Sequence, residues 1–239
     1  MEESICGCYE ETINLNSDTF VKMILVDASF ILELFFKRYS RSWTSDDPIF
    51  EKTRAHAVRL DLLLLENQLP FFVIEKLHDL AFPSPSDYDD LLELSFHYFS
   101  SFNSIQSIQD YSNVKIEHFT DLIRTFKLTP LEMQLKQAKR NSTLIKHLYS
   151  ATQLHKAGGK FEVGTSKCYF DIEFEKGVLK IPSIEFNNTT EVVARNNIMA
   201  FEQTRYIENA YSADYFFFMD LLINIKEDVD LLCDEKNLG

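Results

Sequence analysis

The stretch LDLLLLENQLPFFVIEKL, from Leu60 to Leu77, decides how the chain folds. Its consecutive leucines, Leu62 to Leu65, would point around roughly 300° of a helix at ~100° per residue, so a helix that carries them has to be buried on nearly every side. Pro70 lacks a backbone N–H and disfavours helical geometry at the residue before it, so this helix should stop or kink there. A second helix then starts with Pro70 in its first position. The sequence therefore predicts two helices that meet at an elbow within a helical core.

Three polar residues, Glu66, Asn67 and Gln68, stand at this elbow. Such side chains can pair with the backbone amides and carbonyls that a helix break frees, and each of those groups costs ~1–3 kcal/mol when it is buried without a partner. A ligand-binding elbow is the alternative interpretation. We favour the structural role, because buried polar groups are usually paired within the protein itself.

Helical spacing accounts for most of the first half of the chain. Four predicted helices run from a cap at Ser17 or Asp18 through Phe36, from Pro48 to the elbow, from Pro70 to Leu80, and from Phe119 to Phe126. A further helix is predicted to begin at the acidic residues between Ser86 and Asp90. Asp27 lies seven residues after Phe20, within ~20° of it around the helix, so we expect its carboxylate to point into the core. The acidic start favours helix capping over a cation site, because it lacks the spacing of a calcium-binding loop.

The sequence changes character at Phe161, where β-branched and aromatic residues flank Glu175-Lys176-Gly177. This pattern predicts a hairpin with a tight turn, and Ile184 to Phe186 as a further edge strand. Two helices follow, one from a cap at Asn188 to Tyr206 and one from Ser212 or Asp214 to Leu232. The predicted fold class is mainly α with a small β-hairpin, an α+β fold with an irregular multi-helix core.

Four stretches together resemble one plant family. They are MILVDASFILELFF (Met23 to Phe36), the elbow from Asp61 to Phe72, SATQLHKAGGKFE (Ser150 to Glu162) and IMAFEQT (Ile198 to Thr204). The family is called domain of unknown function 247, or uncharacterised protein family 0481, and the resemblance covers most of Met1 to Leu232. Each motif alone is weakly specific, whereas their combination in this order is specific.

The chain departs from the family pattern at both ends. Family members carry an upstream block with an SIGPYH-like motif and a downstream hydrophobic helix that spans a membrane, and the sequence has neither. The resemblance therefore implies a truncated member, a fragment of a longer domain. Within residues 1–239 we expect one domain with a helical part at 1–126, a basic linker at 127–149, and the hairpin with two C-terminal helices at 150–239.

The resemblance also implies a function. It indicates an uncharacterised plant protein that acts without catalysis, as a protein-interaction or cell-recognition module normally tethered to a membrane. Two alternatives stay open: a hydrolase that uses paired buried carboxylates, and a truncated product without function. Family resemblance does not by itself fix function.

The formal net charge of −13 argues against nucleic-acid binding, because phosphates require a concentrated positive surface. The segment from Lys115 to Lys160 differs, with nine Lys or Arg against three acids. We expect there either a solvated connection or a contact with an anionic membrane surface or an acidic partner. The protein partner is not identified by any motif, and no small-molecule substrate is evident.

The cysteines and histidines show no metal-ligand spacing, and we expect no metal ion and no cofactor. Free thiols indicate a reducing, intracellular compartment. The four cysteines are Cys6, Cys8, Cys168 and Cys233. We predict no transmembrane helix and no signal peptide, because charges interrupt Thr19 to Phe36 and the chain starts with acidic residues.

Acids set in apolar helical stretches supply the enzymatic hypothesis. They are Asp27, Asp61, Glu66, Glu202 and Asp220. A pair of them brought together by folding could have pKa values suited to acid–base or metal-assisted hydrolysis. The structural alternative pairs each acid with a cation or amide, and Arg195 and Arg205 are the expected partners of the last two. No catalytic motif accompanies the acids, so we keep them, with Asn67, Gln68 and Pro70, as structural or interaction candidates.

Overall fold

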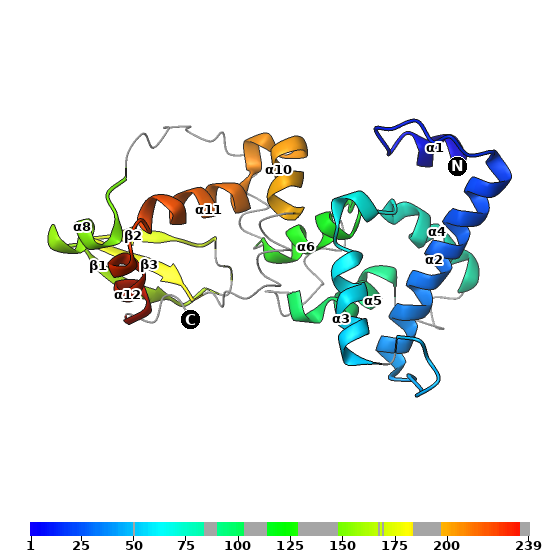
Figure 1. Ribbon diagram of the computed structural model, residues 1–239, viewed down its shortest axis with the longest axis horizontal. Helices are drawn as coiled ribbons and strands as arrows, with labels where there is room; N and C mark the ends of the chain where they lie inside the picture. Colours follow the sequence, from blue (N-terminus) through cyan, green and yellow to red (C-terminus); the bar gives the residue numbers. More distant parts are fainter. Residues whose placement is uncertain are drawn as a thin grey trace. The chain divides into compact units, whose positions relative to one another are not determined.

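The computed structural model describes most of the chain (Figure 1). The described residues are 1–49, 51–83, 90–102, 114–128, 148–166, 168, 170–183 and 197–234, without the side chains of Lys52 and Asp234. The chain divides into two compact units, Met1–Ile123 (unit 1) and Arg124–Gly239 (unit 2). Helices predominate, and unit 2 also holds one small sheet. The predicted fold class, mainly α with a small β part, is confirmed.

Unit 1 is built from helices around an aromatic core. Its segments are α1 (Glu2–Cys6), α2 (Ser17–Ser40), α3 (Lys52–Asp61), the 3-10 turn η1 (Leu65–Asn67), α4 (Phe71–Ala81), α5 (Leu91–Tyr98), the 3-10 turn η2 (Ser100–Phe102) and the start of α6 (Phe119–Lys127). The long helix α2 packs against α4 and α5. The buried ring of Phe35 on α2 lies 4.7 Å from that of Tyr98 and 5.5 Å from that of Phe119, centre to centre. Tilted and edge-on ring pairs add roughly 0.5–1.5 kcal/mol each beyond the area they bury, so this cluster holds the helices together.

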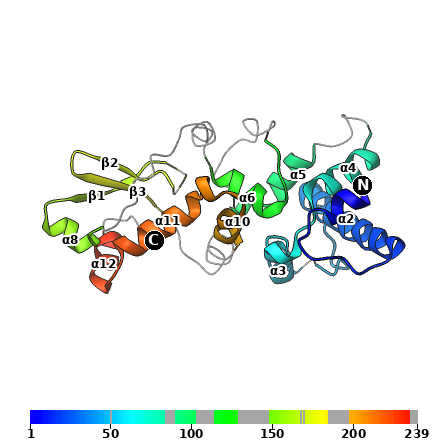
Figure 2. The same ribbon diagram turned by 90° about the horizontal axis from the view of Figure 1, so that it is seen from above.

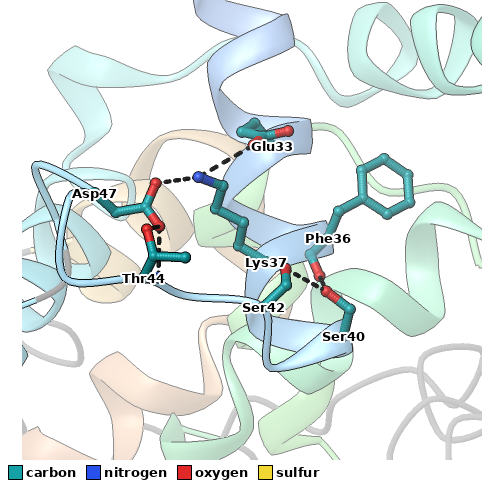
Figure 3. Close-up of polar contacts among 7 residues, drawn as sticks. All are labelled: Glu33, Phe36, Lys37, Ser40, Ser42, Thr44 and Asp47. Atoms are coloured by element: carbon teal, nitrogen blue, oxygen red, sulfur yellow. Dashed lines mark hydrogen bonds and ion pairs between the residues drawn. The ribbon is translucent and has the colours of Figure 1, made fainter.

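Side chains close both ends of α2. Asn16 caps its start and accepts a hydrogen bond from the Thr19 amide at 2.9 Å, one residue before the predicted cap. Figure 3 shows Lys37, near the other end, reaching between Glu33 and Asp47, with which it forms ion pairs. The polar loop after α2 is thus tied back onto the helix.

The elbow is present, but the leucines before it are not helical. α3 ends at Asp61, and Leu62 to Leu64 form a turn and an extended link before η1. The prediction of a helix buried on nearly every side is therefore wrong: Leu62 and Leu63 are buried within a turn, where side chains do not follow the ~100° spacing of a helix. Pro70 is the N-cap of α4, with an extended ψ of 129°, and not its first helical residue. The restart of a helix at Pro70 is as predicted, whereas the preceding helix ends at Asp61 and not at Pro70.

Unit 2 combines a small sheet with helices. Its elements are the rest of α6, α8 (Ala151–Lys156), β1 (Lys160–Gly164), β2 (Glu173–Glu175), β3 (Val178–Pro182), α10 (Met199–Arg205), the 3-10 turn η5 (Ile207–Asn209), α11 (Tyr211–Leu222) and α12 (Lys226–Asp234). β3 lies between β1, to which it is parallel, and β2, to which it is antiparallel. Lys176 (φ 52°) and Gly177 (φ 83°) form the turn of the predicted hairpin, because positive φ at both central residues matches the twist of the strands. The parallel pairing with β1 is an addition that the sequence pattern does not predict.

The sheet lies beside α8, α11 and α12 (Figure 2). The buried core there comprises Ala151, Phe161, Ile181, Tyr215, Met219, Leu222 and Leu232. The predicted single helix from Ser212 to Leu232 is wrong, since two helices are separated at Ile223, which is extended (φ −112°, ψ 101°). A straight helix would place Leu222 and Leu232 ~15 Å apart along its axis, whereas the break lets both reach one core.

Some predictions fall outside the described residues. They are the acidic helix start at Ser86–Asp89, the edge strand at Ile184–Phe186, the helix cap at Asn188 and most of the basic linker. The described α5 begins after Asp90, which accepts a hydrogen bond from the Glu93 amide at 2.9 Å. Among the helices that the structure describes, none is long and apolar enough to cross a membrane.

Candidate functional site

Three of the five acids singled out from the sequence line one open cleft in unit 1. Asp27 comes from α2, Asp61 from the end of α3 and Glu66 from η1, and Glu11 joins them from the segment before α2. All four are exposed. The cleft has a volume of about 580 Å³, within the range of roughly 300–1,000 Å³ that is typical of ligand sites. The elbow is therefore one wall of a cavity large enough for a ligand.

Asp27 does not point into the core. It is exposed, although α2 buries Phe20, Ile24 and Ile31 on the adjoining part of its surface. The angle of ~20° between Asp27 and Phe20 holds for any helix, but Asp27 falls at the margin of the buried face, where the cleft leaves it open. The prediction is wrong because helical spacing gives the direction of a side chain and not what covers it.

The cleft is apolar and acidic. Met23 and Phe30 line it beside Asp27 and are exposed by 42% and 44%. No described Lys, Arg or His lines the cleft, and its four carboxylates form no ion pair within the described part of the chain. The hydroxyl of Tyr9, which also lines the cleft, has a raised pKa. Burial is the main cause, and the negative charges of Cys8 and Asp27 raise it further.

Asn67 and Gln68 hold the elbow in shape. The Gln68 side chain donates hydrogen bonds from Nε2 to the carbonyls of Leu62 (2.9 Å) and Leu64 (2.6 Å). Asn67 Nδ2 donates to the carbonyl of Asp61 at 3.0 Å. Both amide side chains therefore pair with backbone groups freed at the helix break, which is the structural role expected for them.

Glu202, the fourth predicted acid, is fully buried in unit 2 and paired on both oxygens. Oε1 accepts a hydrogen bond from Arg124 Nε at 2.8 Å, and Oε2 accepts from the amides of Ser212 (2.8 Å) and Ala213 (3.2 Å) at the start of α11. Burial raises the pKa of the Glu202 carboxyl, while Arg124 and the two amides oppose that shift. Glu202 therefore stabilises the fold, because its carboxylate links the guanidinium of Arg124 to the N-terminus of α11.

Arg124 is enclosed as well. Its side chain is 1% exposed, Nη2 donates to a carbonyl of η5 at 2.7 Å, and the guanidinium lies 4.0 Å from the centre of the Tyr206 ring. The expected partners were different: Arg205 is exposed and Arg195 lies outside the described residues. The prediction of Arg205 as the partner of Glu202 is wrong, because the cation comes from 78 positions earlier in the chain.

The fifth acid, Asp220, is exposed on α11, whereas Asp228, which the sequence does not single out, is fully buried. Asp228 Oδ1 accepts from the Thr152 amide (2.7 Å) and the Ser150 hydroxyl (2.9 Å), and Oδ2 accepts from two amides before α12 (3.0 and 3.1 Å). Burial alone would raise the pKa of Asp228, but these hydrogen bonds hold it well below its usual range. One carboxylate thus joins the start of α8 to the start of α12. The capping box at Ser150 is visible in the sequence, but its acidic partner is not.

Two basic side chains of the segment from Lys115 to Lys160 are buried or partly buried in unit 2. Arg124 is buried as described, and Lys127 is partly buried, so that burial lowers its pKa to about 8 while Cys168 opposes the shift. The Cys168 thiol donates to the Lys127 carbonyl at 3.0 Å. The Arg124 side chain is therefore not available to a membrane surface.

Comparison with known proteins gives the family. The family model DUF247, described as "Plant protein of unknown function", matches residues 1–238. The chain is 31% identical over 260 aligned residues to "UPF0481 protein At3g47200" of Arabidopsis thaliana, an alignment that covers 99% of this chain and 53% of that protein. It is 33% identical over 92 residues to "Putative UPF0481 protein At3g02645" of the same plant, covering 38% of this chain and 17% of that protein.

The chain thus spans about half the length of the first of these relatives. No solved structure matches it. The family match extends over nearly the whole chain and includes all four stretches that carry the resemblance. The chain belongs to the DUF247 (UPF0481) family of plant proteins of unknown function.

Proposed function

We propose that the protein is a non-catalytic protein-interaction module that holds a segment of a partner protein in the cleft of unit 1. The observation that carries this proposal is the cleft itself, with a volume of about 580 Å³, four exposed carboxylates, exposed apolar side chains and no described cation. Exposed apolar surface beside unpaired charge of one sign is typical of a surface that meets a complementary partner.

A hydrolase with paired carboxylates has less support. Such a mechanism needs a carboxyl group of raised pKa within reach of a bound substrate. Glu202 has a raised pKa, but it is enclosed by Arg124 and the start of α11. The acids of the cleft are exposed and lie in unit 1. Because the acid with the raised pKa is not in the open cleft, binding is favoured over catalysis.

The longer relatives suggest two further features. For this chain, tethering to a membrane and a role in cell recognition are proposals that rest on the family resemblance alone. Both are compatible with a module that binds other proteins, because a tethered module meets its partners at a surface.

Site-directed photo-crosslinking in plant cells tests the proposal. The photoreactive amino acid p-benzoylphenylalanine replaces Phe30 on the cleft or, as the matched control, Phe217 on α11, which is 58% exposed in unit 2. We expect a discrete adduct with the label at Phe30 only. The captured protein, identified by mass spectrometry and purified, should bind the native chain and lose affinity for the variant Phe30→Ser.

Equal adducts from both positions would count against the cleft. So would a purified partner whose affinity is the same for the native chain and for Phe30→Ser. Serine at this position removes the apolar contact at the rim without disturbing the core, since Phe30 is 44% exposed.

A further inference from the structure

We infer that the segment held in the cleft is a basic amphipathic helix of the partner protein. This inference rests on the proposed function and adds the chemistry of the partner to it. Its starting point is the juxtaposition of negative charge and an apolar helix face at one cavity. Both features have to be matched by the same ligand.

The negative charge is spread around the cleft. Glu11, Asp27, Asp61 and Glu66 come from four separate segments of unit 1. Within the described residues no three His, Cys, Asp or Glu side chains are grouped closely enough to hold a metal ion. A single cation would therefore not satisfy them. A ligand that carries several cationic side chains at intervals would, because each carboxylate can pair with a different one.

The apolar part of the surface has helical spacing. Met23 and Phe30 line the cleft from positions i and i+7 of α2 and are exposed by 42% and 44%. Val26, at i+3, does not line the cleft but is 66% exposed on the adjoining surface of the same helix. Asp27, at i+4, stands within the same stripe. Such spacing is typical of a helix face that receives another helix. The occupant is therefore expected to place apolar residues on this stripe and basic residues opposite the acids.

Other occupants fit less well. A second copy of this chain has a net charge of −13 and would add to the negative charge of the cleft. Nucleic acids and anionic membrane surfaces carry the same sign as the cleft and would be repelled. Complementary charge thus selects a basic segment.

Peptide binding to the purified full chain tests the inference. The probe is a designed amphipathic peptide of leucine and lysine of about five helical turns, fluorescently labelled for anisotropy. The comparison peptides carry glutamine in place of lysine, or the same residues in an order that breaks the apolar face. We expect the probe to bind and each comparison peptide to bind roughly tenfold more weakly. The glutamine peptide loses several ion pairs with the carboxylates at once, and the reordered peptide no longer presents its apolar residues on one face.

Two matched triple variants locate the binding. The cleft variant is Asp27→Asn, Asp61→Asn, Glu66→Gln, and the control variant removes the same charges elsewhere in unit 1, as Asp46→Asn, Asp79→Asn, Glu75→Gln, all three exposed. The cleft variant should bind the probe roughly tenfold more weakly and with a smaller dependence on salt, while the control variant should bind as the native chain does.

Equal affinity of the native chain and the cleft variant would overturn the inference. An equal loss in both triple variants would do the same, because it would show general attraction to an acidic protein. A crosslinked partner at Phe30 that lacks a basic amphipathic segment would overturn the inference and leave the proposed function standing. Circular dichroism of both variants confirms that the helices are retained.

Discussion

His118 links one side chain to the pH dependence of stability. Its Nδ1 accepts a hydrogen bond from the Asp121 amide at 3.3 Å, in the first turn of α6, so this nitrogen carries no proton in the folded chain. Burial lowers the pKa of His118 to about 4, although the charge of Glu117 opposes the shift. Between its ordinary pKa of ~6.5 and about 4, the unfolded chain therefore binds more protons at this position than the folded chain does.

The variant His118→Asn tests this linkage. Asparagine keeps an acceptor for the Asp121 amide and does not titrate. The free energy of unfolding of the native chain should fall as the pH drops from 6.5 to 4. It should fall more steeply than that of the variant, by a difference in slope that corresponds to at most one bound proton. Urea unfolding at steps of pH measures both slopes. Parallel profiles over that window would show that His118 is not kept neutral by folding.

The ion pair of Arg124 and Glu202 gives a second prediction at this scale. Arg124→Met leaves a buried carboxylate without its cation and should cost ~3–5 kcal/mol of stability. The double variant Arg124→Met/Glu202→Leu should recover part of this loss, because no buried charge is left. Recovery should stop short of the native value by ~1 kcal/mol, since the amides of Ser212 and Ala213 then lose their acceptor.

A double-mutant cycle measured by urea unfolding separates the two contributions. Glu202→Leu alone completes the cycle. Additive losses from the two single variants would show that the pair is not coupled. That outcome would contradict the 2.8 Å contact between Arg124 Nε and Glu202 Oε1.

The contrast between Asp27 and Glu202 shows what the sequence determines about single residues. Both are acids in apolar helices, and the sequence treats them alike. In the structure one is exposed at a cleft and the other is fully buried. Helical spacing gives the direction of each side chain, but the burial of Glu202 depends on Arg124, which is distant in sequence. The sequence singles out both of these acids but not their surroundings, and it does not single out Asp228.

At the scale of elements, Gln68 is the residue that shapes the elbow. Its Nε2 pairs with the carbonyls of Leu62 and Leu64, and its Oε1 accepts from the Thr120 amide at 3.3 Å. Gln68→Leu removes all three hydrogen bonds from a partly buried site and should cost ~2–4 kcal/mol. Asn67→Leu, an exposed neighbour with one such bond, should cost ~1 kcal/mol or less.

Urea unfolding of the two variants measures both losses. Equal losses would mean that Gln68 does no more than its exposed neighbour. The far-UV circular dichroism of Gln68→Leu should stay close to that of the native chain, because α3 and α4 have their own hydrogen bonds.

The elements that the sequence predicts correctly are those with local causes. Pro70 caps the start of α4, and Lys176-Gly177 turns the hairpin. The errors have distant causes. The break at Ile223 places Asp228 where it accepts from the Ser150 hydroxyl and the Thr152 amide, and the parallel partner of β3 lies before the hairpin in the chain. Neither the contact of Asp228 with the start of α8 nor the pairing of β1 with β3 can be predicted from a short stretch of sequence, because the partners are far apart in the chain.

At the scale of the whole molecule, the charge is not balanced. The net charge is −13, and self-repulsion of this kind lowers the stability of a folded chain. The cleft concentrates part of that charge where no described cation offsets it. Concentrated charge of one sign lowers the stability of the free protein, and the proposed binding role would make this a trade-off between stability and function.

The cleft variant Asp27→Asn, Asp61→Asn, Glu66→Gln should therefore be more stable than the native chain, even as it loses affinity for a basic partner. We expect a gain of about 0.5–1 kcal/mol in the free energy of unfolding at low salt, since exposed like-charge pairs cost a few tenths of a kcal/mol each. Thermal and urea unfolding measure the gain. The control variant Asp46→Asn, Asp79→Asn, Glu75→Gln removes the same net charge and should gain less.

Salt should separate repulsion from other causes. Because the screening length falls from ~10 Å at 0.1 M to ~3 Å at 1 M, the difference between the cleft variant and the native chain should shrink as NaCl is added. A cleft variant that is less stable than the native chain would mean that these carboxylates are structural partners. In that case the acids would not be free to meet a ligand, and the cleft would lose its role as the binding site.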